Sequence, residues 1–205
     1  YFQQLTRMSS AFALMADVSM LLLGGSLKRR ERMSARLGDI LSQLYLASAA
    51  LKRYEDNGEP SDELPLLQWS VRDAFCRIDA AFIDLLENLP FRAISTFLPY
   101  IIFPYGREFK SPRDALSRRV VNVLMEPNPV RERLTAGVYV PRDENEPVGA
   151  LEAALRAVIA AEPVEAKLRA AAKGGAISGR FADELAAQAL AKGVISQAEA
   201  GTLER

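Results

Sequence analysis

The chain has 205 residues, of which 49% are hydrophobic and 25% charged, a composition typical of a folded protein with one fair-sized core or two small ones. Its 26 basic and 26 acidic residues balance, so no overall field draws it to nucleic acid or to an anionic membrane. The sequence contains no histidine, which excludes Ser-His-Asp and Cys-His catalysis and histidine-ligated metal sites.

Three further features limit the class of protein to which the chain can belong. Cys76 is the single cysteine, so it forms no internal disulfide, and we expect a buried small hydrophobe in a reducing cytoplasm. The opening Tyr-Phe-Gln-Gln carries no recognisable targeting signal and indicates a piece of a longer protein. The longest apolar run, residues 12–23, is interrupted by Asp17 and Ser19 and is shorter than the roughly 20 residues of a membrane-spanning helix, so no span is predicted.

Long helices are predicted in the first part of the chain. Apolar residues at steps of three and four predict one helix over residues 2–23, a second over about 26–56 and a third from about 61 to 89. Gly24 and Gly25 separate the first two, the second ends at Asn57-Gly58, and the third ends before Pro90. Two long antiparallel helices joined by a short loop imply a bundle.

Shorter elements follow the bundle. Pro99 and Pro104 divide the aromatic segment 91–105 into pieces too short for long helices. Ser111 is the expected N-cap of the next helix, and Asn128 precedes a shorter one that ends at Gly137. Residues 141–147, with two prolines around a polar run, are the best linker in the chain.

An Ala-rich tail is predicted beyond the linker, with helices over residues 148–161, 164–173 and 181–192 and a final start at Ser196. Two turns nearly repeat, Lys-Gly-Gly-Ala-Ile-Ser at 173–178 and Lys-Gly-Val-Ile-Ser at 192–196. In each, Gly ends one helix while Ile and Ser begin the next. No segment alternates like a strand. We therefore predict an all-α fold, in which a helical bundle of long antiparallel helices is followed by shorter helices and this tail.

A basic cluster is the main candidate binding site. Its five members are Lys28, Arg29, Arg30, Arg32 and Arg36. Such a cluster could bind a phosphate, an acidic partner surface or lipid headgroups. The alternative is a solvated helix start with internal salt bridges, because on a helix these residues spread around much of the circumference. The preceding Gly-Gly pair lacks the spacing and the strand of a phosphate-binding loop.

Two other features have a structural and a functional interpretation. Asp17 lies in an apolar helix, where a buried carboxylate is usually paired with Arg or Lys. The aromatic side chains of the segment 91–105 either anchor the protein in a membrane interface or cover the bundle core or a subunit contact; they are Phe97, Tyr100, Phe103 and Tyr105. Residues 197–205 carry two acids and one base, so no nucleic-acid partner is expected.

Several blocks of sequence resemble a known family. They are YFQQLTRM at 1–8, ADVSMLLLGGSLKRRERMSARLGD at 16–39, LYLASAALKR at 44–53, FPYGR at 103–107 and RERLTAGVYVP at 131–141. Together they resemble the C-terminal part of the bacterial acyl-CoA dehydrogenases of fatty-acid degradation, the FadE type. More distantly, RLGDILSQLY at 36–45 is similar to the second helical domain of very-long-chain acyl-CoA dehydrogenases.

The resemblance implies a flavoprotein of β-oxidation that removes two hydrogens across the α,β bond of an acyl-CoA, with FAD as hydride acceptor and a glutamate as base. That catalytic core would precede Tyr1 and would hold the FAD. No glutamate here falls in a matching base motif, so no catalytic, FAD-binding or metal-binding residue is assigned, and this segment alone is predicted to be inactive. Residues 1–57 would end the dehydrogenase helical region and supply the first long helix of an appended bundle that residues 58–140 complete. The linker 141–147 and the tail 148–205 would follow.

The partners implied by the resemblance are the chain's own dehydrogenase core, a second copy in a homodimer and, through the full-length protein, acyl-CoA and an electron-transfer flavoprotein. The expected location is the cytoplasm, with a peripheral position at the inner membrane as an alternative. The segment would act structurally, in docking or dimerisation. The competing hypothesis is a helical interaction module or a peripheral membrane anchor without a catalytic role.

Overall fold

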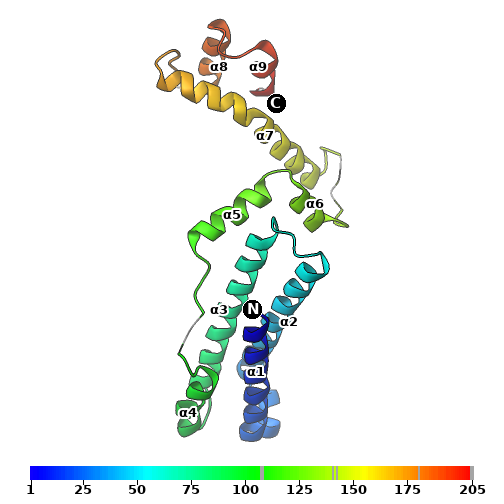
Figure 1. Ribbon diagram of the computed structural model, residues 1–205, viewed down its shortest axis with the longest axis vertical. Helices are drawn as coiled ribbons and strands as arrows, with labels where there is room; N and C mark the ends of the chain where they lie inside the picture. Colours follow the sequence, from blue (N-terminus) through cyan, green and yellow to red (C-terminus); the bar gives the residue numbers. More distant parts are fainter. Residues whose placement is uncertain (107–108, 140, 142, 180, 204–205) are drawn as a thin grey trace. The chain divides into compact units, whose positions relative to one another are not determined.

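The computed structural model describes residues 1–106, 109–139, 141, 143–179 and 181–203, and the chain divides into two compact units, Tyr1–Leu134 and Thr135–Arg205 (Figure 1). Over the described residues the regular elements are helices and no strand occurs, so the predicted all-α class is confirmed. The boundary between the units lies just before the predicted linker 141–147, of which Arg142 is outside the described residues.

The first unit begins with helix α1, Phe2–Leu23, as predicted. It ends at Gly24, and residues Gly24–Arg29 form a short 3-10 helix, η1, before helix α2, Glu31–Asp56. The break at the Gly-Gly pair is therefore confirmed, but the second helix starts later than the expected residue 26. The tighter turns of η1 account for the difference, and the Ser26 hydroxyl donates to the Leu23 carbonyl at 2.6 Å.

Helix α3, Leu64–Glu87, runs antiparallel to α2 and packs along it, which confirms the predicted bundle (Figure 1). The core of this unit comprises one face of each long helix. Its most deeply buried side chains are Met8, Met15, Ile40, Val71, Phe75, Ile78, Phe82 and Leu85. Each such side chain contributes roughly 1.5–3 kcal/mol relative to an exposed position, so the seam between these helices is the main source of stability.

Helix α4, Arg92–Ile102, is not a long helix, as expected, but it continues through Pro99, where a break was predicted. Pro99 lies inside this helix of 11 residues. Pro99 has no N–H to donate to the preceding turn, yet Leu98 and Ile102 lie four residues apart and are both buried in the core. Burial of this apolar face offsets the missing hydrogen bond, and the Phe103 N–H closes the last turn on the Pro99 carbonyl at 2.8 Å.

Two shorter helices complete the first part, α5 at Asp114–Met125 and α6 at Pro129–Thr135. The expected N-cap of α5, Ser111, is wrong, because the helix begins after Arg113, whose backbone is still extended. Asn128 caps α6 as predicted, since its Oδ1 accepts the Arg131 N–H at 3.0 Å. The Trp69 indole donates to the Ser117 hydroxyl at 3.1 Å and ties α5 to α3.

The second unit contains helices α7 at Pro147–Lys173, α8 at Ala182–Ala191 and α9 at Gln197–Leu203. Two helices were expected in place of α7, but it continues through Pro163. A proline removes one backbone hydrogen bond, and the flanking alanines, leucines and lysine are strong helix formers that tolerate the loss. Val164 and Leu168 lie on the buried face of α7. They form a small core with Ile177, Ala189 and Ile195.

The two repeated turns share one geometry. Gly175 and Gly193 have φ of +72° and +67°, which L side chains rarely adopt. Ala176 N–H bonds the Ala171 carbonyl at 2.9 Å, and Val194 N–H bonds the Ala189 carbonyl at 2.8 Å. Both turns are therefore Schellman-type helix ends, followed by the buried Ile177 and Ile195.

The caps after these turns differ. Ser196 begins α9 as predicted, because its hydroxyl accepts the Glu199 N–H at 3.3 Å and Glu199 Oε2 accepts the Ser196 N–H at 2.8 Å. Ser178 does not cap α8, which contradicts the prediction. That helix begins four residues later, and the Ser178 backbone instead makes two hydrogen bonds with the Gln188 amide.

Stability of the second unit should depend on the charge of Glu199. Lys167 and then Ser196 hold the pKa of Glu199 near about 2, below its usual value of 4.5. Because the folded pKa is depressed, the stabilisation is fully present above about pH 4.5 and is lost as the pH falls toward 2. We expect the urea midpoint of Glu199→Gln to lie below wild type above pH 5 and to merge with it near pH 2.

Glu162 on α7 supplies the control, because it is exposed. The Glu162→Gln variant should follow the wild-type midpoint across the same range. A difference between Glu199→Gln and wild type that does not change with pH would contradict the assignment.

Candidate interaction surfaces

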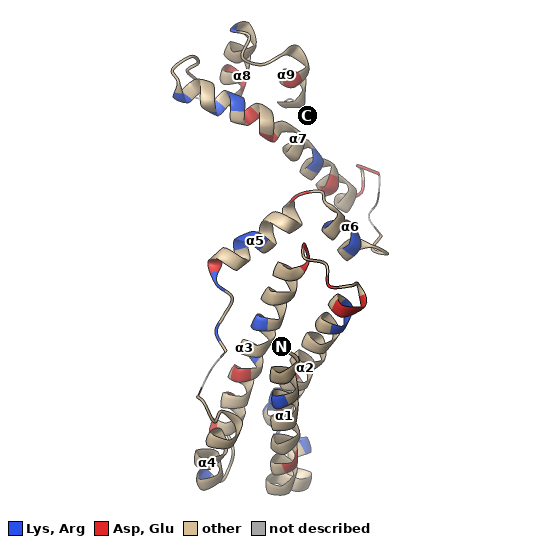
Figure 2. Cartoon of the chain, viewed as in Figure 1, with Lys and Arg blue, Asp and Glu red and all other residues tan. Residues whose placement is uncertain are grey.

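The basic cluster lies at the end of the first unit where α1 gives way to α2, the same end that carries α4 (Figures 1 and 2). Four of the five predicted residues line one hollow of about 410 Å³ together with Asn88; they are Arg29, Arg30, Arg32 and Arg36. Lys28 is exposed on η1 and is not among the lining residues. The structure therefore brings four of the five basic residues together, which helical spacing did not predict.

The internal salt bridges that the alternative interpretation of this cluster includes are not found among the described residues. Among the described residues, no carboxylate lies within 4.0 Å of the side-chain nitrogens of Arg29, Arg30 or Arg32. Arg36 is half-buried and donates to the Met33 sulfur at 3.7 Å, a weak acceptor. The positive charge of this corner is consequently not neutralised within the part of the chain that the structure describes.

The predicted aromatic residues divide between the surface and the core. Phe97 and Tyr100 are 70% and 74% exposed on α4, and Tyr105 beyond it is also exposed. Phe103 is only 8% exposed, and its ring meets Phe82 edge-on with centroids 6.1 Å apart. The proposal that Phe103 is a surface anchor is therefore wrong. It follows directly after buried Ile102 and closes over the end of the bundle core.

Helix α1 presents a second apolar surface. One face is buried, but Leu21 is 85% exposed, and Phe2 and Met20 are exposed as well. Asp17 is exposed, so the expectation of a buried paired carboxylate is wrong there. It lies two residues from both Met15 and Ser19, which line the buried face, and two residues turn a helix by more than half a circle.

The length argument against a membrane span also fails. Residues Phe2–Arg29 form a helical stretch long and apolar enough to cross a membrane, with a mean hydropathy of 1.6 over its most apolar window. Asp17 and Ser19 interrupt the apolar run, but the mean hydropathy of the stretch stays high. In the structure one face of this stretch packs against α2 and supplies Met8 and Met15 to the core.

The apolar end of α1, the exposed aromatics of α4 and the arginine-lined hollow are the candidate interaction surfaces of the first unit. Comparison with known proteins shows the family. The family described as acyl-CoA dehydrogenase, C-terminal, bacterial type, matches residues 1–205. The chain belongs to this family. The resemblance found from the sequence blocks is thereby confirmed. No solved structure matches the chain.

Within this acyl-CoA dehydrogenase domain, the described residues contain no group of three or more Cys, Asp and Glu side chains placed to hold a metal. Cys76 is half-buried rather than fully buried as expected. It occupies α3 next to Phe75, on the edge of the stripe that faces the core.

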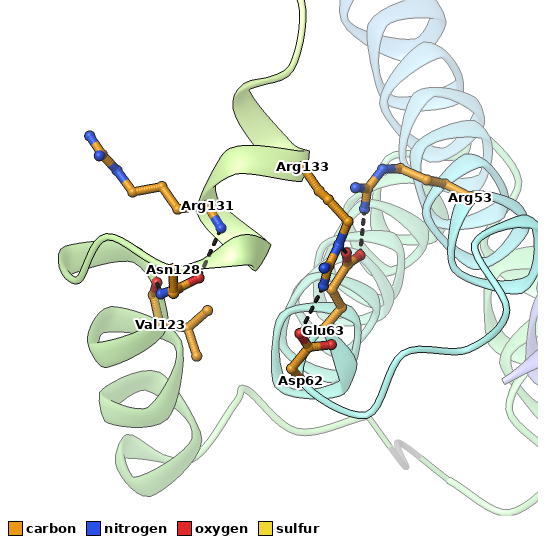
Figure 3. A network of polar contacts seen from close by, with 7 residues as sticks. All are labelled: Arg53, Asp62, Glu63, Val123, Asn128, Arg131 and Arg133. Atoms are coloured by element: carbon orange, nitrogen blue, oxygen red, sulfur yellow. Dashed lines mark hydrogen bonds and ion pairs between the residues drawn. The ribbon is translucent and has the colours of Figure 1, made fainter.

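A network of polar contacts around one buried carboxylate was not predicted. Glu63, just before α3, has a side chain only 3% exposed and accepts hydrogen bonds from two arginines (Figure 3). Arg53 Nη1 of α2 lies 2.9 Å from Glu63 Oε2, and Arg133 Nε of α6 lies 2.6 Å from Oε1. Arg133 also donates to Asp62 at 2.8 Å, which holds the pKa of that carboxyl below its usual value. One buried carboxylate thus joins α2, α3 and α6.

Of the two buried acids, Asp79 and Glu63, the sequence indicates the burial of only the first. Asp79 is 1% exposed, and it lies four residues after Phe75 and three before Phe82, inside the apolar stripe of α3. That position alone indicates burial. Glu63 gave no such signal, because its partner Arg133 is 70 residues away in the chain.

The Glu63→Gln variant should lower the free energy of unfolding by about 2 kcal/mol, because a neutral amide cannot match two guanidinium groups in a buried position. Both arginines are partly exposed, which keeps the loss below that of a fully buried pair. Urea unfolding followed by circular dichroism measures it. Glu55→Gln, which removes an exposed carboxylate 3.9 Å from Lys52, should change the value by less than about 0.5 kcal/mol. Equal losses in the two variants would argue against the role of Glu63.

Proposed function

We propose that this chain is the non-catalytic C-terminal helical domain of an FAD-dependent acyl-CoA dehydrogenase of fatty-acid β-oxidation, and that it docks on the enzyme's own catalytic core. In this proposal the core precedes Tyr1, holds the FAD and the catalytic base, and passes electrons to an electron-transfer flavoprotein. The domain shapes the enzyme, as a docked unit and as part of a homodimer in the cytoplasm, without taking part in the dehydrogenation.

The observation that carries this proposal is the outer face of α1. In its first half the exposed side of α1 carries the polar residues Gln3, Thr6, Ser9 and Ser10, whereas near its end Met20 and Leu21 are exposed side by side. Adjacent large apolar side chains on a surface are typical of a face that another protein layer covers. In this proposal that layer is the dehydrogenase core, which is the partner nearest in the chain.

A neighbouring groove extends this surface. It has a volume of about 390 Å³ and lies between α1 and α2, with Leu5, Phe12, Leu41 and Tyr45 among its lining residues. Leu41 and Tyr45 are exposed although they lie on a well-packed helix. A side chain of the core or of a second copy that enters this groove would bury apolar area without displacing any ion pair of the described residues.

Substitution of Leu21 tests the docking. In the full-length enzyme, Leu21→Glu should lower the temperature at which the flavin is released by several degrees, because a carboxylate would be buried in the interface. Leu151→Glu, an equally drastic change at an exposed leucine of α7, should leave it within error. The domain produced alone should be helical, colourless and inactive toward palmitoyl-CoA. Bound flavin in the isolated domain, or equal effects of both substitutions, would refute the proposal.

A second candidate function is contact with a membrane surface as a peripheral anchor. Its basis is the outer face of α4, where Phe97, Tyr100 and Ile101 are exposed at the same end of the unit as the arginines. Aromatic and aliphatic side chains beside cations are typical of protein segments that lie in the headgroup region of a bilayer. The domain would then act as an interaction module in addition to, or in place of, docking.

Co-sedimentation with vesicles of anionic phospholipid tests this candidate. The full-length protein carrying Phe97→Ser and Tyr100→Ser should remain largely in the supernatant while wild type pellets, because about 1.5 kcal/mol or more of interfacial burial is lost per aromatic ring. Val121→Ser and Val158→Ser remove exposed apolar side chains elsewhere and serve as the control. Phe103 is not substituted in this test, because its side chain belongs to the core. Unchanged sedimentation of the α4 variant would exclude this face.

A further inference from the structure

The arginine hollow is the feature that docking of α1 leaves unexplained. We define it by Arg29, Arg30, Arg32, Arg36 and Asn88, which line it with Glu31 and Met33. These residues come from the end of η1, the first turns of α2 and the residue that follows α3. The hollow, of about 410 Å³, is thus lined mainly by residues 29–36, and the tertiary fold adds Asn88 to it.

The packing beneath the hollow is firm. Met33 forms its floor and is 4% exposed, and it belongs to the same core as Leu23 and Leu89. The Asn88 side chain donates to the Asp84 carbonyl at 2.7 Å, which anchors the wall that α3 supplies. The helical backbone that carries the arginines is thus joined to the bundle core through Met33.

The residues that line the hollow carry an excess of positive charge. Glu31 is the acid among its described lining residues, against four guanidinium groups. No ion pair within 4.0 Å joins Arg29, Arg30 or Arg32 to a carboxylate in the described parts of the chain, and Arg36 donates only to a thioether sulfur. Arg118 and Arg119 on α5 likewise have no carboxylate within 4.0 Å among the described residues, so the distinguishing feature of the hollow is that it gathers four guanidinium groups. Like charges held together without a counter-charge repel one another, and an anion would relieve that repulsion.

We propose that the arginine hollow binds a phosphate-bearing anion, either a soluble phosphate ester or the headgroup of an anionic lipid. A guanidinium group presents a planar fork of N–H donors that matches two phosphate oxygens, and several such groups around one hollow suit an anion with more than one negative charge. A carboxylate would use only one fork and would leave the others uncompensated. The inference does not depend on the docking of α1 or on the aromatic face of α4.

The test is titration of the complete protein with inorganic pyrophosphate at low ionic strength, in parallel with vesicles of phosphatidylglycerol or of phosphatidylcholine alone. The hollow variant is Arg29→Gln, Arg30→Gln and Arg32→Gln. Arg36 is retained because it is half-buried on the core. The control variant Lys110→Gln, Arg118→Gln and Arg119→Gln removes the same charge from exposed positions of the same unit.

Pyrophosphate should bind wild type and the control alike, and the hollow variant about tenfold or more weakly, since charge-assisted hydrogen bonds are lost. That result assigns the site to a soluble phosphate ester. A second outcome is that the wild-type protein binds phosphatidylglycerol vesicles but not pyrophosphate. If the hollow variant then loses vesicle binding and the control variant keeps it, the site is assigned to a lipid headgroup. Binding of neither probe, or an equal loss in both variants, would overturn the proposal.

A variant of the α4 aromatics distinguishes this proposal from the proposed membrane contact of α4. The Phe97→Ser and Tyr100→Ser protein should bind pyrophosphate as wild type does, whatever happens to its vesicle binding. Equal circular dichroism spectra of all variants confirm that the exposed substitutions leave the helices intact.

Discussion

Phe75, Ile78, Phe82 and Leu85 form a stripe along α3 that is almost completely excluded from solvent, and this stripe is the centre of the core of the first unit. Helix α2 lies along α3, while α4 and α5 pack against its sides. Because protein interiors are close-packed, this stripe also fixes both ends of α3. One end carries Glu63 and its two arginines, and the other brings Asn88 next to the arginine hollow.

The long helices could be predicted because their burial repeats with the helical period. Helical periodicity gave the wrong result where a single residue decides whether a helix continues or whether a side chain is buried. Pro99 and Pro163 were taken as helix breaks, but each lies within a helix whose buried face outweighs one missing hydrogen bond. Asp17 and Asp79 both lie in apolar helices, and only the register relative to the buried stripe distinguishes the exposed acid from the buried one.

The sequence predicted which residues belong to the candidate surfaces, but not how these residues are arranged or which of them are exposed. Helical spacing alone spreads the basic cluster around the circumference, whereas in the structure Arg29 at the end of η1, Arg30, and Arg32 and Arg36 of α2 line one hollow. Phe97 and Phe103 look alike in sequence, yet one is solvent-exposed and the other belongs to the core. Contacts such as Glu63 with Arg133 depend on the tertiary fold, and local pattern carries no information about them. Membership of the acyl-CoA dehydrogenase family, by contrast, was evident from short contiguous blocks, because identity of sequence does not require knowledge of the contacts.

The ion pair between Glu63 and Arg133 closes a chain segment of 70 residues, whereas Arg53 reaches the same carboxylate from only 10 residues away. Loop closure costs more entropy as the loop lengthens, so we expect the α2–α3 hairpin to form its polar contact before α6 joins it. Helix α6 has 7 residues and contributes Val130 as its buried side chain, whereas α3 buries a long apolar stripe. We therefore expect α6 to open locally more readily than α3, so that its amide groups exchange with solvent sooner.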